Sequence, residues 1–535
     1  MTLRMDGSMA SLEQPVGGSS GMRPGWLWAA AVAAALALYV ATLAPDLVWQ
    51  DSGDYQFAAA RLDLHRPHDA VRVHPWFLVV AWALGRVGIW SYAYAANLAS
   101  AIGTALAVGN VVLMVRLVTG RAWPAILGGI LFGIGHAVWA HAVMAETYGW
   151  AAALVSAECL CAWAWLARRQ ARWLLLLFLI NGVAISNHLM AVLSLAVFGV
   201  WVVVACVRGR ARYSAIPAAA GCWIVGATLY WIVLGIEYEQ THSLLAALRS
   251  GTVGAWGSRI FNLSDLPGLL GKSILYVCLD YPTPLALAMF VGLWVLWRRR
   301  ETFGRLMVIL AVLYFAWAAR YKVVDQYAFF IQFYVFGSVL IGTGIAVVWP
   351  RLAGVRAWVL LGLALLPIGI YAVLPAAAEK AGFVFFKRQL PHRDPYVYFL
   401  RPWRTGDHGA RQFAEEVLDA LPPRAVLFSD STPAPPLVCL QELEGRRPDV
   451  EIAATGGLPG DRLRHYWGST QNLMPEFQAE GRRVFVVSDH PEYLPTWMIA
   501  YTQRVPFGCV FEVQPRAETP AAATPAGPPK VEGRP

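Results

Sequence analysis

The chain has 535 residues, of which 57% are hydrophobic and only 14% are charged. Soluble domains contain about 25% charged residues, so this composition excludes an ordinary soluble enzyme. The formal net charge of +9 does not require a nucleic-acid partner, because the arginines stand in short turns between apolar runs, where positive charge sets membrane topology. We therefore expect a membrane protein that does not bind nucleic acid.

The two ends of the chain differ from its apolar middle. Residues 1–25 are polar and rich in Gly and Ser, and residues 516–535 are rich in Ala, Pro and Thr. Both compositions are typical of disordered tails. Residues 26–44 carry no charge and are long enough to cross the roughly 30 Å hydrocarbon core of a bilayer. Since no small-residue cleavage site is evident, we predict that they remain as the first membrane span.

Further apolar runs follow, so the sequence predicts about eleven spans, forming a transmembrane domain over residues 26–380. The later spans are expected at 92–115, 122–141, 147–167, 173–186, 189–207, 214–237, 269–297, 306–319, 327–349 and 357–378. The predicted fold class is a polytopic α-helical membrane protein, because a helix satisfies its own backbone hydrogen bonds in lipid.

The apolar run 75–90 is ambiguous, because it is short, begins with Pro75 and contains Arg86. If it crosses the membrane, the later arginine clusters all face outward, against the positive-inside rule. If it lies flat on the outer surface, those clusters face the cytoplasm, and the outer turns at 142–146 and 187–188 carry no Lys or Arg. We therefore predict an interfacial helix at 75–90. The clusters are Arg116 and Arg121; Arg168, Arg169 and Arg172; Arg208, Arg210 and Arg212; Arg298, Arg299, Arg300 and Arg305; and Arg351 and Arg356.

This topology places the N-terminus in the cytoplasm and residues 45–91 in a long first outer loop. Everything after about residue 380 also lies outside the cytoplasm. Residues 385–515 alternate short apolar runs with amphipathic stretches such as 409–421, a pattern typical of a small α/β domain. We expect this domain to be soluble and extracytoplasmic.

The first outer loop is dense in ionisable residues. It contains the segment Trp-Gln-Asp51-Ser-Gly-Asp54, in which a glycine lets the backbone turn tightly and two carboxylates can project into one site. A carboxylate near the lipid surface suits the role of general base, and cationic Arg and His side chains can hold a phosphate. A loop whose charges only keep it in water is the alternative. The other ionisable residues of the loop are Arg61, Asp63, His65, Arg66, His68, Asp69, Arg72 and His74.

Three more polar groups fall at the same outer membrane face. Ionisable groups at membrane depth are costly and usually functional, although each of these alone could also be a helix-end cap. Their occurrence on one face is what a single outward-facing cavity requires. The groups are His136, His141 and Glu146 at the end of the third span, Asn187 and His188 between the fifth and sixth, and Arg320, Lys322 and Asp325 before the tenth.

These residues resemble the motifs of a family of multispanning membrane proteins that includes the protein O-mannosyltransferase acting on plexin-type receptor domains, together with bacterial relatives. Trp-Gln-Asp51-Ser-Gly-Asp54 is similar to the family's opening Asp-Ser-Gly-Glu/Asp motif. The resemblance covers residues 26–350. Four later segments resemble other motifs of the family in the same order: His74-Pro-Trp-Phe, Ala-Glu146-Thr-Tyr, Ser-Asn-His188 and Asp325-Gln-Tyr-Ala-Phe-Phe.

Two departures from the family pattern leave alternatives open. The loop between Asp63 and Pro75 is longer than in the family, so either His65 or His74 could be the family's histidine. The second acid of the first motif is Asp54, where many relatives have Glu.

The resemblance implies a GT-C-like glycosyltransferase, with many spans, an acid-bearing first outer loop and an interfacial helix. It implies a polyprenyl-phosphate sugar donor, a protein, lipid or glycan acceptor, and a site at the outer face of a bacterial inner membrane. Asp51 would be the general base, and Glu146 or Asp54 would orient the acceptor or bind a divalent cation if one is used; no cofactor is certain. The departing phosphate needs positive or hydrogen-bonding groups. Candidates for binding the donor phosphate or the substrates are His65, Arg72, His74, His188, Arg320, Lys322 and Asp325.

Two other functions compete with this hypothesis. A transporter or flippase for a lipid-linked or small anionic substrate would place charges near the membrane midplane, whereas here they crowd one face. A non-catalytic assembly protein would use the spans as an anchor and the outer domain as a binding module.

Overall fold

The computed structural model describes residues 23–66, 68–254, 257, 265–350, 354–385, 387–454 and 469–516. The chain divides into two compact units. The first unit contains the residues up to 386 together with 393–409, and the second contains 387–392 and the residues from 410 onward. Nearly all of the two predicted tails lies outside the described residues.

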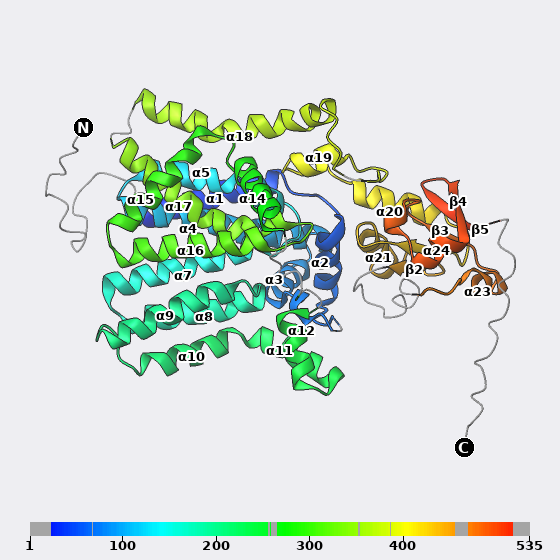
Figure 1. Cartoon of the computed structure of the whole chain (residues 1–535), viewed down its shortest axis with the longest axis horizontal. Helices are drawn as coiled ribbons and strands as arrows, with labels where there is room; N and C mark the ends of the chain where they lie inside the picture. Colours follow the sequence, from blue (N-terminus) through cyan, green and yellow to red (C-terminus); the bar gives the residue numbers. More distant parts are fainter. Residues whose placement is uncertain are drawn as a thin grey trace, which may run out of the picture. The chain divides into compact units, whose positions relative to one another are not determined.

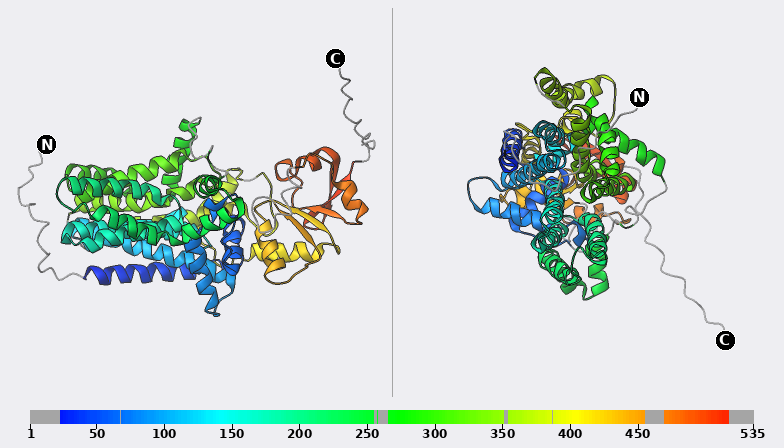
Figure 2. Two further views of the ribbon diagram at one scale, coloured as in Figure 1. Left: turned by 90° about the horizontal axis from the view of Figure 1, so that it is seen from below. Right: turned by 90° about the vertical axis from the view of Figure 1, so that its left-hand side faces the viewer.

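The first unit is a bundle of α-helices, most of which run side by side (Figures 1 and 2). Its main helices are α1 (Pro24–Ala41), α4 (Tyr92–Thr119), α5 (Ala122–Gly133), α6 (His136–Ala142), α7 (Tyr148–Arg168), α8 (Ala171–Asn187), α9 (Ala191–Val207), α10 (Ala215–Gly226), α11 (Thr228–Thr241), α12 (Leu244–Thr252), α14 (Leu266–Asp280), α15 (Ala288–Arg298), α16 (Thr302–Arg320), α17 (Ile331–Val348) and α18 (Val355–Lys380). α4 and α17 are central and largely buried, whereas α1 and α18 expose most of their apolar surface, as helices facing lipid would.

Six helical segments of the described chain are long and apolar enough to cross a membrane: α1, α4, α7, α16, α18 and Gln326–Val348, which includes α17. Two pairs, α5 with α6 and α10 with α11, would each form one span, bent by 67° and 63°. The shorter apolar helices are α8, α9 and Pro284–Arg298. The chain is therefore a multi-pass membrane protein, but the predicted number of spans is not confirmed.

The predicted span 269–297 is interrupted in the structure. α14 ends at Asp280, and a new helical stretch begins at Pro284. A proline has no amide hydrogen and disfavours helical geometry in the residue before it. Thr283 is accordingly extended, and its side chain accepts a hydrogen bond from the Leu285 amide. The sequence pattern missed this break because both halves are apolar.

α2 (Gln50–Arg61) and α3 (Pro75–Arg86) lie at one end of the bundle, where α2 crosses the direction of the long helices (Figures 1 and 2). Phe77 and Leu78 of α3 are buried in a cluster with Ala96 and Ala99 of α4. α3 covers most of the segment predicted to be interfacial and ends before Gly88, whose φ is 76°.

α15 and α17 cross at a short distance because glycines lie at their contact. A Cβ atom added at Gly292 would lie 1.9 Å from the Leu340 carbonyl oxygen, and one added at Gly344 would lie 1.9 Å from the Ala288 carbonyl oxygen. Small residues allow such close backbone approach between membrane helices. This contact therefore has no room for a side chain at either glycine.

The second unit contains a five-stranded sheet with the strand order β2-β1-β3-β5-β4. β1 is parallel to β2 and β3, and β5 is antiparallel to β3 and β4. Phe428, Phe477 and Trp497 pack in its core, and the sheet with its helices confirms the predicted small C-terminal α/β fold. The elements are α20 (Gly409–Ala420), β1 (Val426–Ser429), α21 (Ala434–Glu442), β2 (Glu451–Ala454), α23 (Met474–Ala479), β3 (Val484–Val486), α24 (Thr496–Tyr501), β4 (Thr502–Phe507) and β5 (Val510–Pro515).

Replacing Gly344 with alanine should destabilise the protein, because the new methyl group would overlap the Ala288 carbonyl oxygen. Overpacking of this kind typically costs about 1–3 kcal/mol. The matched control is Gly362→Ala in α18, where an added Cβ meets nothing within 4 Å. Thermal unfolding in detergent should give a lower Tm for Gly344→Ala and an unchanged Tm for Gly362→Ala. Equal Tm values for wild type and both variants would contradict the close contact.

Candidate active site

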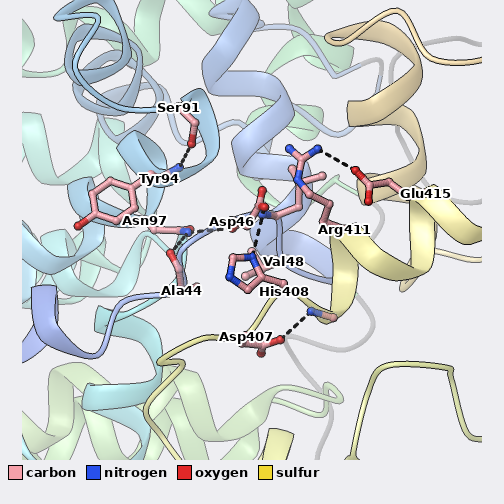
Figure 3. A network of polar contacts seen from close by, with 12 residues as sticks. Ala44, Asp46, Val48, Ser91, Tyr94, Asn97, Asp407, His408, Arg411 and Glu415 are labelled. Atoms are coloured by element: carbon pink, nitrogen blue, oxygen red, sulfur yellow. Dashed lines mark hydrogen bonds and ion pairs between the residues drawn. The ribbon is translucent and has the colours of Figure 1, made fainter.

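The segment before α2 is fixed by side chains from the bundle. Asn97 of α4 donates hydrogen bonds to the carbonyl oxygens of Ala44 and Asp46, at 2.9 and 3.2 Å (Figure 3). Gln56 of α2 donates to the same Asp46 oxygen. The turn into α2 passes through Gln50, whose φ of 59° is uncommon for a residue with a side chain. These hydrogen bonds hold the turn and set the direction of the first residues of α2.

α2 directs its two acidic residues toward two different arginines. Asp51, in the first turn, lies 3.2 Å from Arg72, and its side chain is 52% exposed. Asp54, almost one turn later, forms an ion pair with Arg66, and both side chains are buried. Arg72 also lies 3.6 Å from Asp69. Asp51 is therefore accessible, whereas Asp54 is paired in the interior.

Glu146 lies on the short segment between α6 and α7, directly beside α2. The Ser52 hydroxyl donates a 2.7 Å hydrogen bond to the Glu146 carboxyl group. Ser100 of α4 accepts from the Glu146 amide at 2.7 Å and bonds to its carbonyl oxygen at 2.9 Å. Burial raises the pKa of Glu146; the Ser52 hydrogen bond opposes this shift, and the charges of Asp51 and Asp325 add to it. The net rise favours the protonated acid, because burial penalises the charged form.

Asp325 completes a group of three acidic residues from distant parts of the chain. It lies between α16 and the 3-10 helix η4 (Gln326–Phe330). Burial and the negative charge of Asp51 raise the pKa of Asp325 to about 6. Asp51 and Asp325 both act electrostatically on Glu146, so the three carboxyl groups lie near one another. Among the residues that the structure describes, no three His, Cys, Asp or Glu side chains are grouped so as to hold the divalent cation considered above.

Two stacked histidines lie next to α2. The rings of His74 and His188 have centres 5.1 Å apart, and Tyr55 of α2 contacts His74 edge-on. His74 Nδ1 donates to the Asn187 carbonyl oxygen at 2.7 Å. His188 Nδ1 accepts from the Met190 amide, so His188 carries its proton on Nε2. Burial lowers the pKa of both imidazoles, to about 4 in His188. Both rings are therefore neutral near pH 7 and act as hydrogen-bonding groups rather than cations.

The other predicted residues have different surroundings. The His65 amide donates to the Asp63 side chain in the loop after α2. The Arg320 guanidinium lies 5.3 Å from the ring centre of Trp317 at the end of α16, and Lys322 is exposed. The predicted residues that the structure brings together are Asp51, Arg72, His74, Glu146, His188 and Asp325.

Sequence reasoning did not single out a group of residues that follows the last span. Residues 393–409 belong to the first unit and include the short helix α19 (Pro395–Leu400). Tyr398 of this helix lies close to two guanidinium groups, 4.1 Å from Arg393 and 4.3 Å from Arg404. No motif marks these residues, because tyrosine and arginine are ordinary components of any extramembrane segment.

The raised pKa of Asp325 predicts a pH-dependent stability. The folded state binds this proton more tightly than the unfolded state, so the free energy of unfolding should fall as the pH rises from about 4 to about 6. Asparagine cannot ionise, so Asp325→Asn should remove this contribution. The Tm of wild type and of Asp325→Asn should be measured in detergent across this pH range. The difference between the two Tm values should change with pH. The shift of Glu146 has the same sign and is caused mainly by burial, so most of it is present in both proteins; only the part due to the Asp325 charge is lost in the variant. A pH-independent difference in Tm would contradict the prediction.

Comparisons with known proteins agree with this architecture. Residues 51–213 match the family model for the protein O-mannosyl-transferase TMEM260 N-terminal domain. No curated protein matches the chain by sequence. Among solved structures, ArnT from Cupriavidus metallidurans bound to undecaprenyl phosphate gives a TM-score of 0.58 at 14% identity, over 92% of this chain and 98% of that one.

Two further solved structures are similar to this chain. The apo state of the same ArnT gives a TM-score of 0.52 at 15% identity, over 91% of this chain and 97% of that one. An Archaeoglobus fulgidus oligosaccharyltransferase in complex with Zn and sulfate gives a TM-score of 0.46 at 14% identity, over 89% of this chain and 71% of that one. The chain therefore has a GT-C-like fold similar to that of ArnT, and its residues 51–213 are similar to the TMEM260 N-terminal domain of protein O-mannosyl-transferases.

Proposed function

We propose that this protein is a glycosyltransferase that moves a sugar from a polyprenyl-phosphate-linked donor to an acceptor at the outer face of a membrane. The observation that carries this proposal is the convergence of Asp51, Glu146 and Asp325 beside Arg72 at one end of an apolar bundle. The lipid-linked donor is supported by the similarity to ArnT bound to undecaprenyl phosphate. A protein acceptor is supported by the O-mannosyl-transferase family match.

Asp51 is the residue best suited to act as general base. Its side chain is half exposed, and the neighbouring Arg72 orients its carboxylate. The carboxylate accepts the proton of an acceptor hydroxyl as the acceptor oxygen bonds to the anomeric carbon of the sugar. The bond from that carbon to the phosphate oxygen breaks at the same centre. The products are the glycosylated acceptor and polyprenyl phosphate.

Glu146 and Asp325 have different tasks in this proposal. Burial raises the pKa of Glu146 and so favours its protonated form, in which the carboxyl group can donate a hydrogen bond. Ser52 already occupies its Oε1, which leaves Oε2 to meet a substrate oxygen. Asp325, with its pKa of about 6, is mainly ionised at pH 7 and can accept hydrogen bonds from sugar or acceptor hydroxyls. Together the two residues orient the reacting groups.

Arg72, His74 and His188 form the side of the site assigned to the donor phosphate. Arg72 supplies a permanent positive charge, which favours the phosphate that departs from the sugar. His188 presents its Nε2 proton, because Nδ1 is occupied by the Met190 amide. His74 stacks on His188 and keeps that ring in place. His65, Arg320 and Lys322 remain candidates for contacts with the lipid phosphate or the acceptor outside this group.

Asp54 is assigned a supporting role instead of a direct one. Its ion pair with Arg66 ties α2 to the loop that follows it, and the same loop carries Arg72. The Asp54–Arg66 ion pair therefore keeps Asp51 of α2 close to Arg72 of the loop. Removing one partner of a buried ion pair leaves an uncompensated charge and is strongly destabilising.

The orientation in the membrane is part of the proposal. The N-terminus is cytoplasmic, and the first loop and the C-terminal domain are extracytoplasmic, as the positive-inside rule favours. A bacterial inner membrane is the proposed location. The polyprenyl chain would lie along the lipid-facing helices, while its phosphate meets Arg72 at the outer face.

Asp51→Asn should reduce sugar transfer by at least about 100-fold, because asparagine cannot accept the acceptor's proton. The assay uses purified protein in detergent, a panel of radiolabelled polyprenyl-phosphate hexoses and a peptide rich in Ser and Thr. The control is Asp63→Asn in the same loop, where the amide oxygen can still accept from the His65 amide. This control should transfer sugar at the wild-type rate.

Size-exclusion profile and Tm should be the same for Asp51→Asn, Asp63→Asn and wild type. Wild-type rates for a correctly folded Asp51→Asn variant would remove the assignment of Asp51 as base. Absence of transfer from every donor by the wild-type protein would remove the proposed function itself.

A further inference from the structure

Residues 393–409 pack on the segment that leads into α2. The Arg404 amide donates to the Thr42 carbonyl oxygen at 2.9 Å. His408 Nδ1 lies 3.5 Å from the Asp46 carboxylate, and Figure 3 shows the two side chains facing each other. Asp46 is the residue whose carbonyl oxygen is held by Asn97 of α4. The segment after the last span is therefore fixed to the same loop that positions Asp51.

The same residues also pack on α6, which leads to Glu146. Trp403 and Trp139 of α6 have ring centres 5.3 Å apart, and the Trp139 indole donates to the Thr42 hydroxyl at 3.0 Å. Residues 393–409 thus contact both segments that carry the acidic residues of the site. Such a position makes this segment part of the wall of the active site.

Tyr398 is held firmly within this wall. The Arg404 guanidinium lies 4.3 Å from its ring centre and donates hydrogen bonds to the Tyr398 and Arg401 carbonyl oxygens. Arg393 lies 4.1 Å from the same ring centre and 5.7 Å from that of Trp49, two residues before the general base. A guanidinium within about 6 Å of an aromatic ring is attracted to it. These contacts fix the direction in which the tyrosine hydroxyl points.

Tyr398 lies near the acidic group. Tyr398 is close enough to Glu146 and Tyr327 for their charges to act on one another, and its side chain is only partly covered. Burial raises the pKa of Tyr398, and the charges of Arg393 and Arg404 only partly offset this rise. The phenol therefore keeps its proton and can donate a hydrogen bond.

We propose that Tyr398 is a substrate-binding residue, whose hydroxyl donates a hydrogen bond to a hydroxyl group of the bound sugar or of the acceptor. Arg404 is a positioning residue that acts through Tyr398. The inference rests on the proposed function, because it assigns Tyr398 to the same site. It assigns one wall of that site to residues 393–409, beyond the last predicted span.

The test is Tyr398→Phe, which keeps the ring and its contacts with both arginines and removes only the hydroxyl. We expect kcat/KM for sugar transfer to fall roughly tenfold, as the loss of one neutral hydrogen bond predicts, with Tm unchanged. A rise in KM for the donor alone places the contact on the sugar, and a rise in KM for the acceptor alone places it on the acceptor. The matched control is Tyr396→Phe in the same helix, whose hydroxyl donates to the Phe383 carbonyl oxygen; its kinetics should equal wild type.

Arg404→Lys tests the positioning role. It keeps the charge but loses the guanidinium fork, so it should lower kcat/KM in the wild-type background and have little further effect in Tyr398→Phe. Equal losses in both backgrounds would show that Arg404 acts independently of Tyr398 and would overturn its positioning role.

Unchanged kcat and KM values in Tyr398→Phe, measured on a wild-type protein that transfers sugar, would overturn the role of Tyr398 while leaving the proposed function intact. Failure of the wild-type protein to transfer sugar from any donor of the panel would instead remove the proposed function and this inference with it.

Discussion

The hydrogen bond from Ser52 to Glu146 joins the two segments on which the candidate site depends. Both segments are held by one helix: Asn97 of α4 bonds the chain before α2, and Ser100 bonds the backbone of Glu146. Residues three apart on a helix lie on the same face, so one face of α4 positions both the segment leading to Asp51 and the segment carrying Glu146. Because α4 is largely buried at the centre of the bundle, the site is built on a helix that is packed on most of its surface.

Placing acidic residues at the end of an apolar bundle costs free energy unless each is paired, neutral or exposed. The structure uses all three solutions. Asp54 is paired with Arg66 in the interior, and Glu146 is favoured in its protonated form by burial. Asp51 remains half exposed beside Arg72. Only the third solution leaves a carboxylate that a substrate can reach, so the surroundings separate Asp51 from Asp54, which share one sequence motif.

The sequence predicted the features that depend on composition and charge. Apolar runs indicated a multi-pass membrane protein, and counting arginines placed Glu146, His188 and Asp325 on the same side as Asp51. The break at Pro284 was missed because hydropathy does not register a three-residue interruption. Ser100 and Asn97 were also missed, since single small polar residues inside an apolar helix carry no pattern. The segment that carries Tyr398 contacts residues more than 200 positions away, among them Thr42 and Trp139, and such tertiary contacts leave no periodic pattern in the sequence.

The interior of the bundle argues for an enzyme working at one face instead of a transporter. A transporter exposes a central site alternately to both sides by moving helices against one another. Here several interior polar side chains form hydrogen bonds between helices: Asn110 of α4 with Trp28 of α1 and Ser156 of α7, and Glu158 of α7 with Asn181 of α8. The glycines at the crossing of α15 and α17 bring the two helix backbones into close contact. The acidic group of Asp51, Glu146 and Asp325 lies at one end of the bundle, where a lipid-linked substrate could be bound and processed without passing through the protein.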